Sequence, residues 1–91
     1  MTWAIRITEE ATKQSRKLEP NANKQIHDYL RNRVAPLHDP RLLGKPLRFS
    51  THPNRWRYRV ATYRILCEIR EKELLVLVIK VGHRRSVYRR L

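Results

Sequence analysis

Three arginines alternate with apolar residues in one short segment of the last third of the chain: Arg55, Arg57 and Arg59. Successive side chains of a β-strand point to opposite faces, so these arginines share one face. Trp56, Tyr58 and Val60 share the other face, which we expect to meet helices. Guanidinium groups bind phosphates through paired hydrogen bonds, so a face lined with arginine suits a polyanion.

A second group of cationic and titratable residues lies downstream. Arg64 is on the next predicted strand, and four more residues follow the end of an apolar strand: His83, Arg84, Arg85 and Tyr88. Guanidiniums can stabilise the extra charge of a pentacovalent phosphorus transition state. His83 can exchange a proton near neutrality, and Tyr88 can stack on a base or bond to a 2′-hydroxyl. The mixture therefore suits RNA chemistry.

Each of these residues also has a simpler interpretation. A run of arginines on a strand is commonly a solvated face, and a histidine beside a glycine is commonly an ordinary loop residue. Trp56 and Tyr63 are expected to lie in the core. Cys67, on the Tyr63 face of its strand, is expected to be a small buried hydrophobe.

We expect neither a metal site nor a cofactor. The other histidines have no spacing typical of metal ligands: His27, His38 and His52. A two-metal nuclease needs clustered carboxylates, and the C-terminal 41 residues contain three: Glu68, Glu71 and Glu73. Cys67 is the single cysteine, which excludes a disulfide and a cysteine-based zinc site within one chain.

Composition limits the class of protein. The 91 residues suffice for one small domain over 1–91. Lys and Arg number 21 against 8 Asp and Glu, which gives a net charge of +13, and the C-terminal 41 residues carry +8 of it. The apolar content of 41% is too high for a disordered basic tail. A folded, strongly cationic domain suits a polyanion or an acidic protein partner.

The sequence predicts no membrane association. Residues 1–6 contain no apolar segment typical of a signal peptide. The longest apolar run, Leu74 to Ile79, is far too short to span a bilayer. We therefore expect a cytoplasmic protein with no membrane partner.

Six elements must position the candidate residues. The pattern predicts a strand over 3–7, helices over about 9–18 and 21–35, and strands over 55–60, 63–69 and 74–81. Thr8 and Asn21 are the predicted helix caps. Ala61-Thr62 is a predicted tight turn, and Gly82 is expected to end the last strand. The expected fold is an α+β domain of β-α-α-β-β-β order, with two N-terminal helices on one face of an antiparallel sheet.

Three segments together resemble the RelE-type toxins of the RelE/ParE superfamily. They are Trp-Arg-Tyr-Arg-Val-Ala-Thr-Tyr-Arg-Ile at 56–65, Leu-Val-Leu-Val-Ile-Lys-Val-Gly-His-Arg at 75–84, and Val-Tyr at 87–88. The predicted order of elements fits this family over nearly the whole chain, and the part from Trp56 to Tyr88 is the specific signal.

The resemblance implies a toxin of a bacterial toxin–antitoxin pair. RelE-like members are endoribonucleases that cut messenger RNA in the ribosomal A site without a metal. The 2′-hydroxyl of a nucleotide attacks the adjacent phosphate and the 5′-oxygen leaves. The implied partner is an acidic antitoxin of the RelB type, which neutralises the toxin. The net charge of +13 agrees with both partners.

The resemblance also assigns catalytic positions. Arg57 and Arg59 match two basic positions that are lysines in the best-known members, Arg64 matches the Tyr-Arg motif, and Arg84 matches the arginine after Val-Gly-X. His83 lies where histidine-bearing relatives place a catalytic histidine.

Tyr88 matches the tyrosine that orients the substrate nucleotide. Because arginine holds its proton, proton transfer shifts toward His83 or Tyr88. Arg55 and Arg85 are expected to bind RNA without taking part in catalysis.

Two alternatives from other classes stay open. A ParE-like inhibitor of DNA gyrase would share the fold but lack the nuclease residues, and the combination of Arg64, Arg84 and Tyr88 favours the nuclease. A non-catalytic RNA-binding or ribosome-binding module would lose affinity in proportion to the charge removed and would cut nothing.

Overall fold

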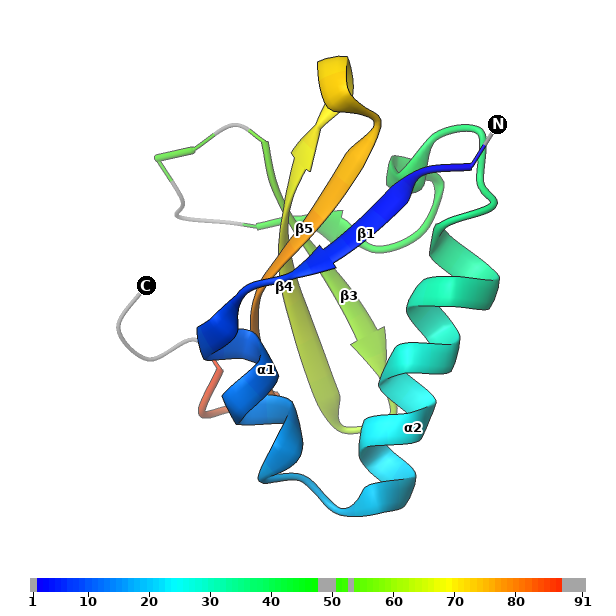
Figure 1. The fold of residues 1–91 in the computed structure, drawn as a ribbon. Helices are drawn as coiled ribbons and strands as arrows, with labels where there is room; N and C mark the ends of the chain where they lie inside the picture. The colour runs from blue at the N-terminus through cyan, green and yellow to red at the C-terminus, as the bar shows by residue number, and fades with distance from the viewer. Residues whose placement is uncertain (1, 48–50, 53, 88–91) are drawn as a thin grey trace.

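The computed structural model describes residues 2–47, 51–52 and 54–87. Five strands form one sheet in the order β1–β5–β4–β3–β2 (Figure 1). Two helices, α1 (Glu9–Arg16) and α2 (Pro20–Tyr29), pack against one face of this sheet. The strands are β1 (Ala4–Ile7), β2 (Lys45–Pro46), β3 (Arg55–Val60), β4 (Tyr63–Arg70) and β5 (Leu75–His83). No helix of the described part is long and apolar enough to cross a bilayer.

The α+β fold with both helices on one face confirms the expected class. The sheet itself is mixed, because β1 pairs in parallel with β5 whereas β2 to β5 pair antiparallel. Short turns force β3, β4 and β5 to alternate in direction. The chain leaves β1 through two helices and a long loop, so this connection imposes no antiparallel pairing. The expectation of a wholly antiparallel sheet is therefore corrected at β1.

The first helix is capped as predicted. The side chain of Thr8 accepts a hydrogen bond from the amide of Ala11 at 3.1 Å. Glu9 and Glu10 occupy the first turn, where the positive end of the helix dipole favours carboxylates. The helix ends at Arg16, two residues earlier than expected.

The second helix begins differently from the prediction. Glu19 is the cap residue and makes no side-chain capping bond, and Pro20 occupies the first turn. Asn21 is therefore inside the helix, which corrects its predicted capping role. Proline suits this position because its missing N–H would have no helical partner there. The helix continues as a π-helical segment, Leu30–Val34, in which the amide of Ala35 donates to the carbonyl of Leu30.

The core lies between the helices and the sheet. Ile26 and Leu30 from the second helical segment meet Tyr58, Ile65 and Val78 from the strands, and all five are at most 2% exposed. The ring centroids of Tyr29 and Tyr58 are 6.0 Å apart. Cys67 is fully buried, as predicted, and burial raises the pKa of its thiol.

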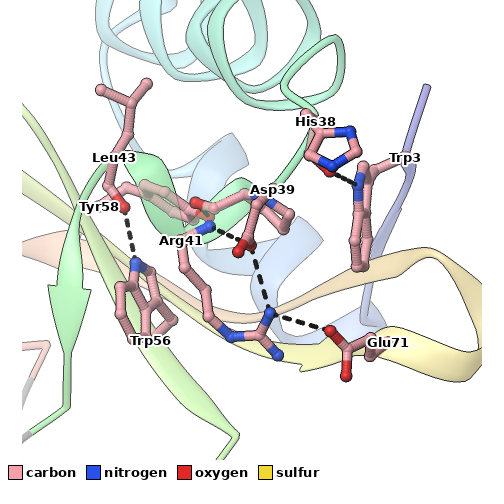
Figure 2. Close-up of polar contacts among 9 residues, drawn as sticks. Trp3, His38, Asp39, Arg41, Leu43, Trp56, Tyr58 and Glu71 are labelled. Atoms are coloured by element: carbon pink, nitrogen blue, oxygen red, sulfur yellow. Dashed lines mark hydrogen bonds and ion pairs between the residues drawn. The ribbon is translucent and has the colours of Figure 1, made fainter. Parts of the chain in front are cut away.

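The loop before β3 is fastened to the core by aromatic side chains (Figure 2). Trp56 donates its indole N–H to the carbonyl of Leu43 at 2.7 Å, and Tyr58 donates its hydroxyl to the carbonyl of Pro40 at 2.7 Å. Gly44 has φ of +72°, and a Cβ there would collide with the carbonyl oxygen of Arg57. Only glycine fits this close approach, so the loop lies directly against β3.

The last strand differs from its predicted course in two ways. It continues through Gly82 to His83 instead of ending before them. Leu66 pairs with Lys80 while Cys67 pairs with Val78, so Ile79 is an extra residue on β5. This β-bulge reverses which face each later residue of the strand points to.

Candidate nucleic-acid interface

The face of the sheet opposite the helices carries the cationic side chains of the strands. Tyr58, Ile65 and Val76 are fully buried on the helix side, and residues of alternate parity form the other face, here called the basic face. Pairing across the strands places eight cationic residues on it: Arg6, Lys45, Arg55, Arg57, Arg59, Arg64, Arg70 and Lys80. Glu68 is the acidic residue that the described strands place there.

The predicted faces of β3 are confirmed by the packing of its apolar side chains. Tyr58 is fully buried on the helix side, and Trp56 and Val60 pack against the core from the same side. Arg57 and Arg59 point to the basic face, where they pair across the ladder with Leu66 and Arg64. The structure therefore brings Arg57, Arg59 and Arg64 together.

Arg64 has a structural contact as well as a charge. It is 7% exposed, and its Nη1 donates to the carbonyl of Tyr63 at 3.0 Å and to that of Ala61 at 3.3 Å. Ala61 has φ of 52°, a conformation that costs an alanine energy because its Cβ is crowded. The guanidinium of Arg64 thus closes the predicted turn at Ala61-Thr62.

The segment after β5 folds over the end of this face. The amide of Arg84 donates to the carbonyl of Thr62 at 2.9 Å, and the amide of Val87 donates to that of His83 at 2.9 Å. A Cβ at Gly82 would lie 3.5 Å from the Cβ of Val87, so Val87 covers the glycine. Arg84 is therefore fastened beside the β3–β4 turn that Arg64 closes.

An open depression of about 370 Å³ lies at this end of the sheet. It is lined by Thr62, His83, Arg84, Arg85 and Ser86. Arg84 and Arg85 are exposed, and neither forms an ion pair with a described residue. Two cationic and two hydroxyl side chains around a solvent-open hollow can bind an anion the size of a phosphodiester.

The bulge at Ile79 places His83 on the helix side of the sheet. His83 pairs with Tyr63 across the ladder, and their ring centroids are 4.9 Å apart. Its ring therefore does not share the face of Arg59 and Arg64, although it lines the depression with Arg84. The structure joins the predicted histidine to one part of the predicted arginine cluster and not to the other. Tyr88, the sixth predicted catalytic residue, lies outside the described residues.

Arg55 is set apart from the other predicted arginines. Its Nε lies 3.5 Å from Glu68, and Arg70 donates a 2.7 Å hydrogen bond to the same carboxylate. The hydrogen bond from Arg70 lowers the pKa of Glu68, and the charge of Arg55 adds to this effect. Arg55 therefore belongs to an ion-paired cluster at the opposite end of the basic face.

Lys80 is a site candidate that the sequence patterns missed. It stands in a strand that reads as apolar on both faces, and the bulge directs it onto the basic face opposite Leu66. The lysine itself was the available signal in the sequence, because a lysine inside an apolar central strand must reach solvent or a polar partner.

The arrangement suits a negatively charged ligand and supplies little acid–base chemistry. The cationic cluster consists mostly of guanidiniums, which do not release a proton near neutrality. Among the described residues, no three His, Cys, Asp or Glu side chains are grouped as metal ligands would be. A substrate phosphate held between Arg59, Arg64 and Arg84 would meet charge stabilisation first, with His83 at the rim of the depression as the titratable group.

Comparisons with known proteins bear on the same regions. A family model described as the ParE toxin of type II toxin–antitoxin system, parDE, matches residues 5–88. Toxin RelG of Mycobacterium tuberculosis is 29% identical over 90 residues, which cover 99% of this chain and 100% of RelG. The sequence match therefore includes both helices and all of the predicted site.

Solved structures agree with the fold. The toxin–antitoxin complex RelBE2 from Mycobacterium tuberculosis contains a chain similar to this one, with a TM-score of 0.80, 26% identity, and coverage of 92% of this chain and 93% of that chain. The isolated RelE toxin of E. coli gives a TM-score of 0.72 and 26% identity, with coverage of 94% and 90%. The chain belongs to the RelE/ParE superfamily of toxins from type II toxin–antitoxin systems.

Proposed function

We propose that this toxin is a ribosome-dependent messenger RNA endoribonuclease that needs no metal. The observation that carries the proposal is the convergence of Arg59, Arg64 and Arg84 around the β3–β4 turn. Arg84 lines a solvent-open hollow beside this turn, and no carboxylate of the described residues pairs with Arg59 or Arg84. A phosphodiester fits this surface better than a neutral ligand does.

The reaction follows from an attack within the RNA. The 2′-oxygen forms a bond to the adjacent phosphorus, the bond from phosphorus to the 5′-oxygen breaks, and a cyclic phosphate remains. The proton of the 2′-hydroxyl must pass to a base, and the departing 5′-oxygen must receive a proton. Arg57, Arg59, Arg64 and Arg84 stabilise the extra charge on the phosphorane. His83 is the proposed proton-transfer group, and Tyr88 is proposed to orient the nucleotide.

The proposed partners follow from the charge and from the relatives. Several similar toxins have been solved with a RelB antitoxin, including the RelBE2 pair and a RelE bound to a RelB peptide. A chain with net charge +13 binds an acidic antitoxin and RNA through the same kind of surface. We therefore propose a RelB-like antitoxin as the inhibitor and the cytoplasm as the site of action.

A cell-free bacterial translation reaction tests the proposal directly. Purified protein is added, and new 5′ ends on the message are mapped by primer extension. We expect cuts at fixed codon positions that vanish when ribosomes are omitted. EDTA cannot test whether cleavage needs magnesium, because the ribosomes themselves need it. Initiated ribosome complexes exchanged from Mg²⁺ into Ca²⁺ test this instead.

The same purified protein distinguishes the alternatives. An intact message together with inhibited DNA supercoiling by gyrase would replace the nuclease with the ParE-like activity, which the family description keeps in view. An intact message together with RNA or ribosome binding would leave a non-catalytic module. Either result would overturn the nuclease proposal.

A further inference from the structure

The cations of the basic face lie in rows that cross the strands. The end row contains Arg59, Arg64 and Gly82, which are paired in that order across β3, β4 and β5. Two residues further along the strands, about 6–7 Å away, lies the inner row: Lys45, Arg57, Leu66 and Lys80. The proposed reaction uses the end row and Arg57, and it leaves Lys80 without a role.

Lys80 reaches this row through an irregularity in the strand. Leu66 pairs with Lys80 and Cys67 pairs with Val78, so the extra residue Ile79 shifts the parity of β5. Without the bulge, Lys80 would point toward the helices and Val81 toward solvent. With it, Val81 is 4% exposed in the core, and Lys80 stands half-buried beside the fully buried Leu66, with Arg57 on the other side of Leu66.

The third row ends the run of positive charge. It contains Arg55 and Glu68, which pair across β3 and β4, and then Leu77 and Arg6. The carboxylate of Glu68 lies 3.5 Å from Arg55 and 2.7 Å from Arg70. Two arginines are thereby engaged by one acid, so the third row attracts an anion less than the first two rows do.

We propose that Lys80 binds the phosphate next to the one held by the end row, and that Glu68 marks where this track stops. The RNA strand would then run along the direction of β4, with successive phosphates over the end row and the inner row. The inference rests on the proposed function for the identity of the ligand as RNA. Binding of a phosphate by Lys80 does not require cleavage, so its test uses RNA that cannot be cut.

The test measures binding of a short, single-stranded 2′-O-methyl RNA by fluorescence anisotropy over a series of salt concentrations. Each phosphate contact to single-stranded nucleic acid contributes about 0.7 to the slope of log affinity against log salt. We expect Lys80→Met to weaken binding and lower the slope by about 0.7. Lys80→Arg should restore both, because it keeps the charge at the same position.

Lys72→Met is the matched control. Lys72 is an exposed lysine in the short 3-10 turn Glu71–Glu73, at the other end of the sheet. Lys72→Met removes the same charge from the protein but at a position away from the proposed track, so we expect a salt slope close to that of the wild type. Equal slopes for Lys80→Met and Lys72→Met would overturn the role of Lys80, provided that both variants melt at the wild-type temperature.

Glu68→Gln tests the boundary of the track. Removing this carboxylate releases Arg55 and Arg70, so binding should tighten and the slope should rise by about 0.7. Glu9→Gln, on the exposed side of α1, makes the same charge change away from the basic face. An equal gain from both substitutions would show that Glu68 does not bound the track.

The outcomes separate this inference from the proposed function. If the wild type leaves messages intact but Lys80→Met lowers the salt slope of RNA binding, the nuclease proposal is refuted and the phosphate contact of Lys80 is supported. If the wild type cuts messages but Lys80→Met leaves RNA binding unchanged, the nuclease proposal is supported and the phosphate contact of Lys80 is refuted. A wild-type protein that does not bind the methylated RNA at all would overturn the inference.

Discussion

The two ends of the basic face contain the same residue type in opposite surroundings. At the β4–β5 end, Arg55 and Arg70 share Glu68. Nearby, Arg41 bridges Asp39 at 3.2 Å and Glu71 at 3.6 Å (Figure 2). At the β3–β4 end, Arg59, Arg84 and Arg85 form no ion pair with a described residue.

The contrast shows that an arginine's role is set by its neighbours. At one end, carboxylates give arginines a structural role, because the pairs Arg41–Glu71 and Arg55–Glu68 each join separate segments of the chain. At the other end the guanidiniums keep their charge available for a ligand. Arg64 has a structural role of another kind, since its guanidinium closes a turn through carbonyl groups instead of a carboxylate.

Arg84→Ala gives the largest expected effect and tests the unpaired end. Removing one donor from a transition-state anion site typically lowers kcat by about 100-fold or more, and we expect such a loss in ribosome-dependent cleavage. The melting temperature should stay near that of the wild type, since the bond from Arg84 to Thr62 uses the backbone amide. Normal cleavage by this variant would move the active site elsewhere.

Arg64→Met tests whether one residue serves both roles. Loss of its hydrogen bonds should lower the free energy of unfolding by about 2 kcal/mol, because two carbonyls of the turn lose a charged donor. Cleavage should also fall strongly. The measurement is urea unfolding of Arg64→Met and of Arg59→Met. Because Arg59 is exposed, its substitution should lower the free energy of unfolding only slightly. Equal stability losses would remove the distinction between the two arginines.

Arg41→Gln tests the paired end. The side chain is 30% exposed, and loss of its two ion pairs should cost about 0.5–1 kcal/mol in urea unfolding. Message cleavage should stay at the wild-type rate, because Arg41 pairs with Glu71 at the β4–β5 end of the sheet and the β3–β4 turn lies at the other end. A large loss of cleavage without unfolding would contradict the division between the two ends.

The smallest expected effect is a pH dependence at Glu68. Its pKa is lowered in the folded protein, so its contribution to stability is present above the unfolded value of about 4.3 and is lost as the pH falls through the folded value. The wild type should therefore exceed Glu68→Gln in unfolding free energy at pH 7 by less than about 1 kcal/mol. Urea titrations should show this gap closing below pH about 4.3. If the difference in unfolding free energy persists in acid, it comes from the packing of the side chain and not from its charge.

Local patterns in the sequence predicted much of the fold correctly. The alternation of Arg55 to Val60 placed its two faces, Thr8 capped its helix, and the turn at Ala61-Thr62 formed where it was predicted. These features depend on residues close together in the chain. The cap at Asn21 was wrong for a local reason too, because Pro20 is better suited to the first turn and the helix begins there.

The site was less predictable, and β5 explains why. Its residues are apolar on both sides, so alternation alone does not reveal a change of parity. The bulge at Ile79 moves Lys80 to the basic face and His83 to the side of Tyr63. Each position of this strand is decided by its pairing with β4, which the strand's own pattern does not encode.

By itself the sequence determined the charge, the order of elements and the cationic face of β3, because composition and side-chain alternation are properties of short segments. Tertiary structure decided which arginines meet carboxylates, how β1 pairs, and on which faces Lys80 and His83 lie. Those outcomes depend on contacts between segments distant in the chain, such as Arg41 with Glu71 and Arg84 with Thr62. The chemistry of each cation is set by such contacts, since a guanidinium beside a carboxylate and one beside an open hollow differ only in their surroundings.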